Sequence, residues 1–208
     1  MTRPIPIVHV VDDDNSFRTA VSRLLRAAGY QVRAYSSAGD FLLSWQADTP
    51  GCVVLDVHMP GPSGLDLQDA VGKRTQALPI IFLTGHGDIP MSVRTMKNGA
   101  VDFLTKPVQR EALLSAVDSA LARDAQNRAA GVALSALRAR FDSLSPRERS
   151  VFALVVAGRL NKEIAAELGT SERTVKAHRA QVMLKMEVTT LADLVRAAEQ
   201  LQAATPSP

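Results

Sequence analysis

Short apolar runs alternate with longer periodic segments in the first half of the chain. The runs at 7–11, 52–55, 79–83 and 101–105, with Gln31–Tyr35 between the first two, each have the length of one strand. Between them a 3.6-residue period predicts helices at 17–28, 37–45, 63–74, 89–98 and from Val108 onward, the first capped by Asp14 or Asn15 and ended by Gly29. This alternation predicts an α/β fold: a flavodoxin-like, doubly wound parallel sheet of five strands in the order 2-1-3-4-5.

The second half of the chain is predicted to be all helical. From Arg110 to Phe141 no proline occurs, and only Gly131 weakens an alanine-rich pattern, which favours a long linker helix with Gly131 as a candidate hinge. The alternative is a helix that ends near Arg123, followed by a flexible tether. Four short helices are predicted after Leu144, and a disordered tail at 205–208. The expected limits are 5–124 for an α/β domain, 125–141 for a helical linker and 142–204 for a helical domain.

Composition narrows the class of protein. The 208 residues, 46% hydrophobic and 22% charged, suffice for two small globular domains. One cysteine, Cys52, excludes an internal disulfide, and no apolar stretch approaches the ~20 residues of a membrane helix. We therefore expect a cytoplasmic protein with no membrane partner. Residues 1–125 carry 12 Lys/Arg and 13 Asp/Glu (net −1), whereas 126–208 carry 12 and 8 (net +4), which favours a polyanionic partner for the second half.

Polar residues follow the ends of four predicted strands. Asp12, Asp13 and Asp14 follow the first run and Asp56 follows the third. Thr84 and Lys106 follow the last two. In a parallel sheet these side chains converge at one edge, where open α/β sheets place their sites.

An acid at a strand–helix turn is often only a helix cap. Two adjacent acids with a distant third, however, suit Mg²⁺. Asp56, expected at an exposed rim, could accept a phosphoryl group as an acyl phosphate. Lys106 and Thr84 could then contact its oxygens, and Gly85 leaves room for it.

No further metal site is expected from the histidines and the cysteine. His58 and His86 have no Cys or second His at metal-ligand spacing, so a zinc site is not expected. His9, inside a strand, is expected to be a satisfied core or face residue. Cys52 and Trp45 are expected to pack in the core.

Residues 161–180 show a helix-turn-helix pattern. Ile164, Ala165 and Leu168 would pack the first helix, Gly169 would make the turn, and Val175 would anchor the second helix. The second helix would fit the DNA major groove and expose Arg173, Thr174, Lys176, Ala177 and Arg179. A generic three-helix core could produce the same pattern without binding DNA.

The segments at 11–14, 55–64, 83–88 and 100–107 resemble those of bacterial response-regulator receiver domains, and the run at 84–91 resembles the FixJ branch in particular. The resemblance spans about residues 5–124. It implies that a sensor histidine kinase phosphorylates Asp56. It also implies a Mg²⁺ (or Mn²⁺) site formed by Asp13 and Asp56 directly, Asp12 mainly through water and the His58 carbonyl.

The same resemblance assigns a signalling role to residues around the predicted crevice. Thr84 and Phe103 would form the switch pair, with Gly85 beside the phosphoryl group. Phe103 often corresponds to Tyr in such domains, so the switch would act by burial alone. Lys106 would contact the phosphoryl group and precede a cis bond to Pro107.

The stretch 144–198 resembles the LuxR/NarL-type DNA-binding domain. The resemblance implies that Lys176 and Ala177 face bases. It places Arg179, Lys162 and Lys185 near phosphates. The other expected DNA-contact residues are Thr170, Ser171, Arg173 and Thr174. Ala180 stands where some relatives carry a second basic residue, so the target sequence cannot be borrowed from them.

These features predict a response regulator rather than an enzyme. Phosphorylated by its kinase, it would form a homodimer and bind double-stranded promoter DNA to regulate transcription, with activation the expected sign and RNA polymerase a further partner. One alternative is a constitutive DNA-binding regulator with a vestigial receiver, against which the intact Asp13, Asp56, Thr84 and Lys106 argue. The other is an aspartyl-phosphate phosphatase of the haloacid-dehalogenase type, which would carry an acid at the position of His58.

Overall fold

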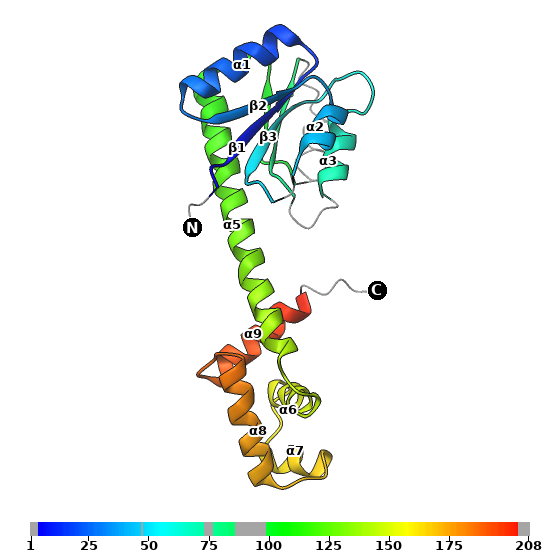
Figure 1. Cartoon of the computed structure of the whole chain (residues 1–208), viewed down its shortest axis with the longest axis vertical. Helices are drawn as coiled ribbons and strands as arrows, with labels where there is room; N and C mark the ends of the chain where they lie inside the picture. Colours follow the sequence, from blue (N-terminus) through cyan, green and yellow to red (C-terminus); the bar gives the residue numbers. More distant parts are fainter. Residues whose placement is uncertain (1–3, 47, 73–76, 86–98, 204–208) are drawn as a thin grey trace. The chain divides into compact units, whose positions relative to one another are not determined.

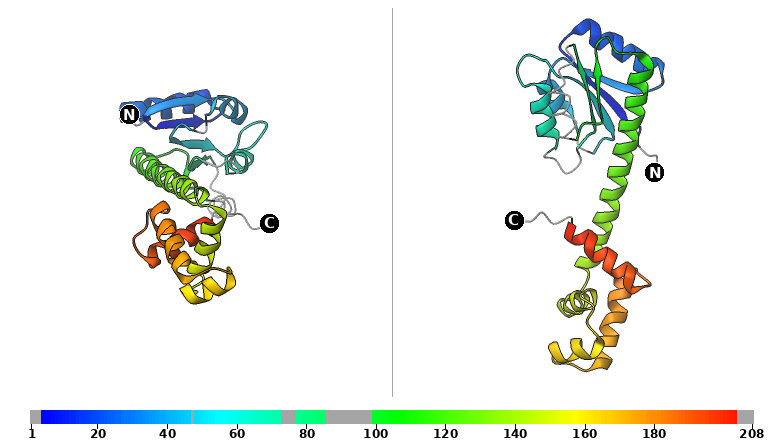
Figure 2. Two further views of the ribbon diagram at one scale, coloured as in Figure 1. Left: turned by 60° about the horizontal axis from the view of Figure 1, so that its bottom comes forward. Right: turned by 180° about the vertical axis from the view of Figure 1, so that it is seen from behind.

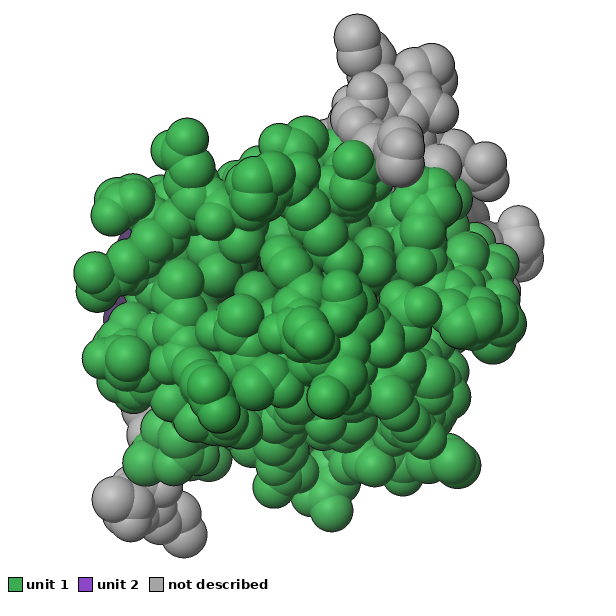
Figure 3. All heavy atoms as spheres, turned by 90° about the horizontal axis from the view of Figure 1, so that it is seen from above, with its two compact units in different colours: residues 1–128 green, residues 129–208 purple. Residues whose placement is uncertain are grey.

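The computed structural model describes residues 4–46, 48–72, 77–85 and 99–203. The chain divides into two compact units, residues 1–128 and residues 129–208, which are coloured separately in Figure 3. The boundary between the units falls within the long helix α5 (Arg110–Asp142).

The first unit contains a five-stranded parallel sheet (Figure 1). Its strand order is β2-β1-β3-β4-β5, which confirms the predicted flavodoxin-like topology. The strands are β1 (Ile7–Val11), β2 (Gln31–Tyr35), β3 (Gly51–Asp56), β4 (Ile80–Thr84) and β5 (Asp102–Thr105). Every residue of β1, β3 and β4 is buried, as expected for central parallel strands covered on both faces.

Helices cover both faces of this sheet (Figure 2). They are α1 (Asn15–Ala27), α2 (Ala38–Ser44), α3 (Gly64–Gly72) and the first part of α5. One core cluster includes residues of α2 and α3, and the other includes residues of α1 and α5. Asp14 caps α1 by accepting from the backbone N–H groups of Ser16 and Phe17, so Asp14 rather than Asn15 is the cap. The helix predicted at 89–98, and the predicted end of α3 at Arg74, lie outside the described residues.

The residues assigned to packing are in the core, with one correction. Cys52 and Trp45 are buried as expected. His9 is also buried, and its Nδ1 lies 3.1 Å from the Tyr35 hydroxyl. Its Nε2, however, has no hydrogen-bond partner in the described part of the chain, so the expectation of a satisfied histidine holds for one ring nitrogen only.

The long helix α5 runs without a break from Arg110 to Asp142, through Gly131. The prediction of a long linker helix is therefore confirmed, and the alternative helix end near Arg123 is wrong. Leu113 and Val117 of α5 belong to the core of the first unit, while Leu137 belongs to that of the second. Asp124 is buried in α5 and accepts a 2.9 Å hydrogen bond from the backbone N–H of Gly51, where β3 begins.

The second unit is helical. After the end of α5 come α6 (Pro146–Val156), α7 (Asn161–Glu167), α8 (Glu172–Lys185) and α9 (Leu191–Ala203). Ser145 and Glu148 form a capping box at the start of α6, and Ser171 caps α8. Gly169 adopts φ +60° in the turn between α7 and α8, a conformation that glycine accepts without strain. No helix in the described ranges is long and apolar enough to cross a membrane.

Candidate phosphoryl and nucleic-acid sites

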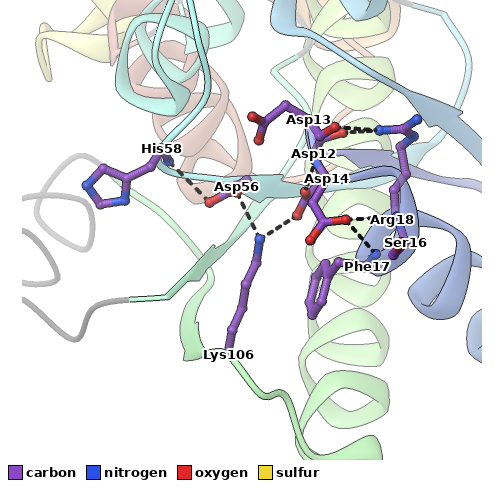
Figure 4. Close-up of polar contacts among 9 residues, drawn as sticks. All are labelled: Asp12, Asp13, Asp14, Ser16, Phe17, Arg18, Asp56, His58 and Lys106. Carbon is purple, nitrogen blue, oxygen red and sulfur yellow. Dashed lines mark hydrogen bonds and ion pairs between the residues drawn. The ribbon is translucent and has the colours of Figure 1, made fainter.

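Three carboxylates meet at the carboxyl edge of the sheet. Asp12 and Asp13 follow β1, and Asp56 is the last residue of the neighbouring strand β3. One oxygen of each lies within 4.8 Å of the others (Figure 4). The strand register causes this convergence, since Val11 pairs with Leu55 and the acids follow directly.

Lys106, which follows β5, bridges two of these acids. Its Nζ lies 2.7 Å from Asp12 Oδ2 and 2.8 Å from Asp56 Oδ2. The ammonium also lies 4.2 Å from the centre of the Phe17 ring. The predicted convergence of acids and lysine is therefore present in the described structure.

The carboxylates of this cluster outnumber the ammonium that bridges them, because Lys106 contacts only Asp12 and Asp56 of the three converging acids. Burial raises the pKa of Asp12 above its ordinary value, against the hydrogen bond from Lys106, which lowers it. Burial alone would lower the pKa of Lys106, but its hydrogen bonds with Asp12 and Asp56 raise it. A hard divalent cation prefers oxygen ligands and would offset the surplus negative charge, so this donor set fits Mg²⁺.

The exposure of the acids differs from the expectation in one respect. Asp56 was expected at an exposed rim, but it is only 6% exposed. Its Oδ1 accepts a 3.1 Å hydrogen bond from the backbone N–H of His58. The His58 side chain is exposed and points away from the acid cluster (Figure 4). Asp13 is exposed, so the cluster is open to solvent on its side.

The remaining predicted receiver residues lie on neighbouring strands. Thr84 ends β4 and is fully buried. Gly85 follows it and is exposed, and a Cβ added there would meet no atom within 4 Å, so space is available beside it. Phe103 in β5 is partly buried against one of the two core clusters of the first unit. The peptide bond before Pro107 is cis, as the resemblance implied.

Sequence reasoning missed three residues around the cluster. Phe17 is the first residue of the helix predicted at 17–28, with no role expected in the cluster, but its ring contacts the Lys106 ammonium. Arg18 donates from Nη1 to the backbone carbonyl of Asp12 at 2.6 Å and to that of Asp13 at 3.3 Å. A Cβ at Gly64 would lie 2.5 Å from the Asp56 carbonyl oxygen, so this glycine permits the start of α3 to approach the end of β3 closely. The Arg18 contacts are local, five and six residues along the chain, whereas the contact of Phe17 with Lys106 depends on tertiary structure.

The helix-turn-helix candidates fall into two groups. Ile164, Ala165 and Val175 are buried in the core of the second unit, as predicted. The exposed candidates are Lys162, Ser171, Arg173, Lys176 and Ala177. Those partly buried are Thr170, Thr174, Arg179 and Lys185.

Two of the partly buried residues already make contacts within the unit. Arg179 Nη1 donates to Asn161 Oδ1 at 2.7 Å. Lys185 Nζ lies 2.7 Å from Glu148 Oε2 and donates to the Ser143 carbonyl at 3.3 Å. The Lys185 ammonium thus has partners that hold α8 to α6, which favours a role in folding over the expected phosphate contact.

An acid cluster with a bridging lysine on a flavodoxin-like sheet, in one chain with a helix-turn-helix unit, defines a transcriptional response regulator. Comparison with known proteins agrees. Residues 8–118 match the model of the response regulator receiver domain, and residues 142–198 match that of bacterial regulatory proteins of the luxR family.

Individual relatives match along nearly the whole chain. Nodulation protein W of Bradyrhizobium diazoefficiens is 50% identical over 195 residues, which are 94% of this chain and 86% of that protein. Transcriptional regulatory protein FixJ of Azorhizobium caulinodans is 44% identical over 191 residues, 92% of this chain and 90% of that protein. The low-resolution structure of response regulator StyR superposes with a TM-score of 0.79 at 45% identity, covering 94% of this chain and 99% of that one.

The chain therefore belongs to the two-domain response regulators of the FixJ/NarL type, with a receiver domain and a LuxR-type DNA-binding domain. A kinase and DNA are the partners that this pair of domains implies.

Proposed function

We propose that Asp56 is the phosphoacceptor and that its phosphorylation controls dimerisation and promoter binding by this protein in the cytoplasm. One observation carries the proposal: the Asp56 carboxylate lies 2.8 Å from Lys106 Nζ and within 4.8 Å of carboxylate oxygens of Asp12 and Asp13. Mg²⁺ or Mn²⁺ would be held by Asp12, Asp13 and Asp56, with the His58 carbonyl as a further ligand. When bound, the cation would screen the negative charge of the cluster and of the incoming phosphoryl group.

The chemistry follows from these positions. An Asp56 oxygen forms a bond to phosphorus while the P–N bond of a phosphohistidine on the kinase breaks, and the imidazole nitrogen keeps the electron pair and is protonated by solvent. Lys106 then neutralises charge on the transferred group, and Thr84 offers a hydroxyl to its oxygens. Gly85 leaves space beside it. A shift of Thr84 toward the phosphoryl group would allow Phe103 to turn inward.

The proposed limits are 5–124 for the receiver, 125–141 for the helical linker and 142–204 for the DNA-binding domain.

Two DNA-binding domains brought together in a phosphorylated homodimer would engage paired half-sites, because linkage raises the effective concentration of the second domain. In DNA, Lys176 and Ala177 would face bases. The proposed contacts around them are made by Lys162, Thr170, Ser171, Arg173, Thr174 and Arg179. RNA polymerase would be the further partner of an activator.

The test of the acceptor assignment is intact-protein mass spectrometry after incubation with Mg²⁺ and acetyl phosphate. We expect one phosphoryl group, mapped by peptide analysis to Asp56 and absent from Asp56→Asn. A phosphatase would instead release inorganic phosphate continuously from many monoesters. A constitutive regulator with a vestigial receiver would gain no mass and would bind DNA equally with and without the donor.

The test of coupling is sedimentation combined with DNA titration, with and without phosphodonor. Phosphorylation should tighten DNA binding about 5–150-fold, the range of typical coupling free energies. Thr84→Ala should remove most of that gain while leaving the mass gain in place. A phosphorylated protein that stays monomeric with unchanged DNA affinity would refute the mechanism.

A further inference from the structure

The Lys106 ammonium is held on three sides by described residues (Figure 4). Two sides are the carboxylates of Asp12 and Asp56, at 2.7 and 2.8 Å. The third is the face of the Phe17 ring, whose centre lies 4.2 Å from Nζ. A cation over an aromatic face is attracted by the negative charge of the ring face, and the attraction grows when the cation is shielded from water.

The Phe17 side chain is held in place by its neighbours, whereas the Lys106 side chain is flexible. The Phe17 backbone N–H donates to Asp14 Oδ1 at 3.1 Å in the capped first turn of α1, and its side chain packs against the core cluster shared by α1 and α5. The lysine side chain, by contrast, has four rotatable bonds and needs neighbours to define one position. The ring therefore restricts where the ammonium can lie, rather than following it.

The position of the Lys106 ammonium affects both cation binding and phosphoryl transfer. Asp12 and Asp56 are also two of the three acids whose oxygens converge for a cation. An ammonium tightly held between them repels a divalent cation and competes for the same oxygens. The same ammonium is the group that would neutralise the phosphoryl oxygens beside Asp56. Holding it close thus weakens cation binding and favours phosphoryl transfer.

We propose that Phe17 is a positioning residue that holds the Lys106 ammonium between Asp12 and Asp56, so that it lowers the cation affinity of the cluster and raises the rate of phosphorylation. The second half of this inference rests on the proposed acceptor role of Asp56. A leucine at position 17 keeps apolar packing but lacks the aromatic face. A tyrosine keeps the face and is the matched control.

The experiment combines two measurements on the full chain. The Mg²⁺ dissociation constant of the metal-free protein is measured by calorimetry, and the initial rate of mass gain from acetyl phosphate is measured at saturating Mg²⁺. For Phe17→Leu we expect the dissociation constant to fall and the rate to fall, each about two- to tenfold, the range of a partly shielded cation–aromatic contact. Phe17→Tyr should match the parent protein in both.

A double-mutant cycle separates positioning from general damage to the fold. In a Lys106→Ala background, Phe17→Leu should no longer change the Mg²⁺ dissociation constant, because its effect is transmitted through the lysine. An effect that persists without the lysine would overturn the inference. So would weaker Mg²⁺ binding together with slower phosphorylation, which is what a distorted site would give.

The design also distinguishes this inference from the proposed function. If the parent protein gains no phosphoryl group at Asp56, the proposed function fails, while the calorimetric cycle still decides whether Phe17 positions Lys106. If the parent is phosphorylated and Phe17→Leu behaves like it in both measurements, only the inference about Phe17 fails.

Discussion

A lysine contacts a buried carboxylate in each of the two units and lowers the pKa of both acids, yet the net pKa shifts of the two acids have opposite directions. In the receiver unit, Lys106 Nζ lies 2.7 Å from Asp12 Oδ2, and the pKa of Asp12 is nevertheless raised, mainly by burial. In the helical unit, Lys185 Nζ lies 2.7 Å from Glu148 Oε2, and this hydrogen bond, together with that from the Ser145 N–H, lowers the pKa of Glu148 to about 2. Since the two distances are equal, the difference arises from the surroundings.

The surroundings differ first in burial, which is the largest influence on the pKa of Asp12 and a lesser one on that of Glu148, and then in the neighbouring charge. Asp12 shares its lysine with Asp56, which adds negative charge beside it. Glu148 accepts from Lys185 and also from the backbone N–H of Ser145 at 2.7 Å, inside the capping box. An acid whose own donors balance it stabilises the fold, whereas a cluster with surplus negative charge is suited to a cation or to a change of charge.

The prediction with the largest expected effect tests the surplus of negative charge in the acid cluster. Asp13→Ala should abolish both Mg²⁺ binding and phosphorylation, because it removes the exposed carboxylate of the three-acid set. Calorimetry with Mg²⁺ and mass analysis after treatment with acetyl phosphate measure the two losses. The matched control is Asp14→Ser, which removes a neighbouring acid but keeps a residue able to cap α1. Phosphorylation of Asp13→Ala at the parent rate would contradict the assignment of Asp13 to the cation site.

The second expected effect concerns pH. Burial, with a smaller contribution from Arg33, lowers the pKa of His9 from 6.5 to about 4. A histidine with a depressed folded pKa binds protons more readily when unfolded, so its stability contribution is present above pH 6.5 and is lost as the pH falls toward 4. The loss should reach on the order of 3 kcal/mol.

Urea unfolding monitored by Trp45, the one tryptophan of the chain, reports on the receiver unit. The measurement is best made in an Asp12→Asn background, since Asp12 titrates in the opposite sense. Glu148 contributes stability above pH 4.5 that is lost as the pH falls toward 2, so the helical unit should keep its ellipticity in the window where the receiver weakens. A His9→Phe receiver with the same loss between pH 6.5 and 4 would exclude His9 as its cause.

The third prediction concerns the balanced acid. Glu148→Gln keeps one acceptor oxygen for the capping box but removes the charge that faces Lys185. We expect the helical unit to lose about 1.5–3 kcal/mol of unfolding free energy, the value of a hydrogen bond to a charged group. Thermal unfolding followed by ellipticity measures this loss, with the exposed Glu199→Gln as control. Unchanged stability would mean that the pair contributes no more than a surface ion pair.

The fourth prediction has the opposite sign. Asp12→Asn should stabilise the metal-free receiver, because it removes a buried carboxylate whose ionised form is disfavoured by burial. Its Oδ1 can still accept the 2.9 Å hydrogen bond from the Asp14 N–H. Urea unfolding at pH 7 without Mg²⁺, read from Trp45, tests the sign. The exposed Asp69→Asn is the control, and destabilisation of Asp12→Asn would show that the lysine bridge outweighs the burial of the acid.

Local patterns predicted the elements and tertiary contacts decided the rest. Short apolar runs and period-3.6 segments predicted alternating strands and helices, and right-handed βαβ connections leave few sheet orders for five such units. They could not show that Asp56 is buried, because that depends on pairing with Leu83 in β4 and on the close approach at Gly64. Nor could spacing show that Phe17 faces Lys106, since those residues follow different strands.

The sequence could not show that Lys185 contacts Glu148, because this contact too depends on tertiary structure. Its position near the end of α8 resembles that of a phosphate contact, but Glu148, its partner, is on α6. The motif reports which residue types stand at which positions, whereas the competition between an internal acid and a phosphate depends on the packing of two helices. A lysine that is satisfied within the fold is less available to DNA.

The last prediction separates Lys185 from Lys162, which is exposed on α7. Lys162→Gln should weaken binding alike on specific and random DNA and lower the salt slope by about one unit, with unchanged stability, because only one phosphate contact is lost. Lys185→Gln should instead lower the unfolding free energy by about 1.5–3 kcal/mol through the loss of its contact with Glu148, and leave the salt slope unchanged. Lys185→Arg, which keeps the charge, is the control. DNA titrations at several salt concentrations and thermal unfolding give both quantities. If Lys185→Gln lowers the salt slope by one unit at unchanged stability, Lys185 contacts a phosphate. The proposed difference between Lys185 and Lys162 is then wrong.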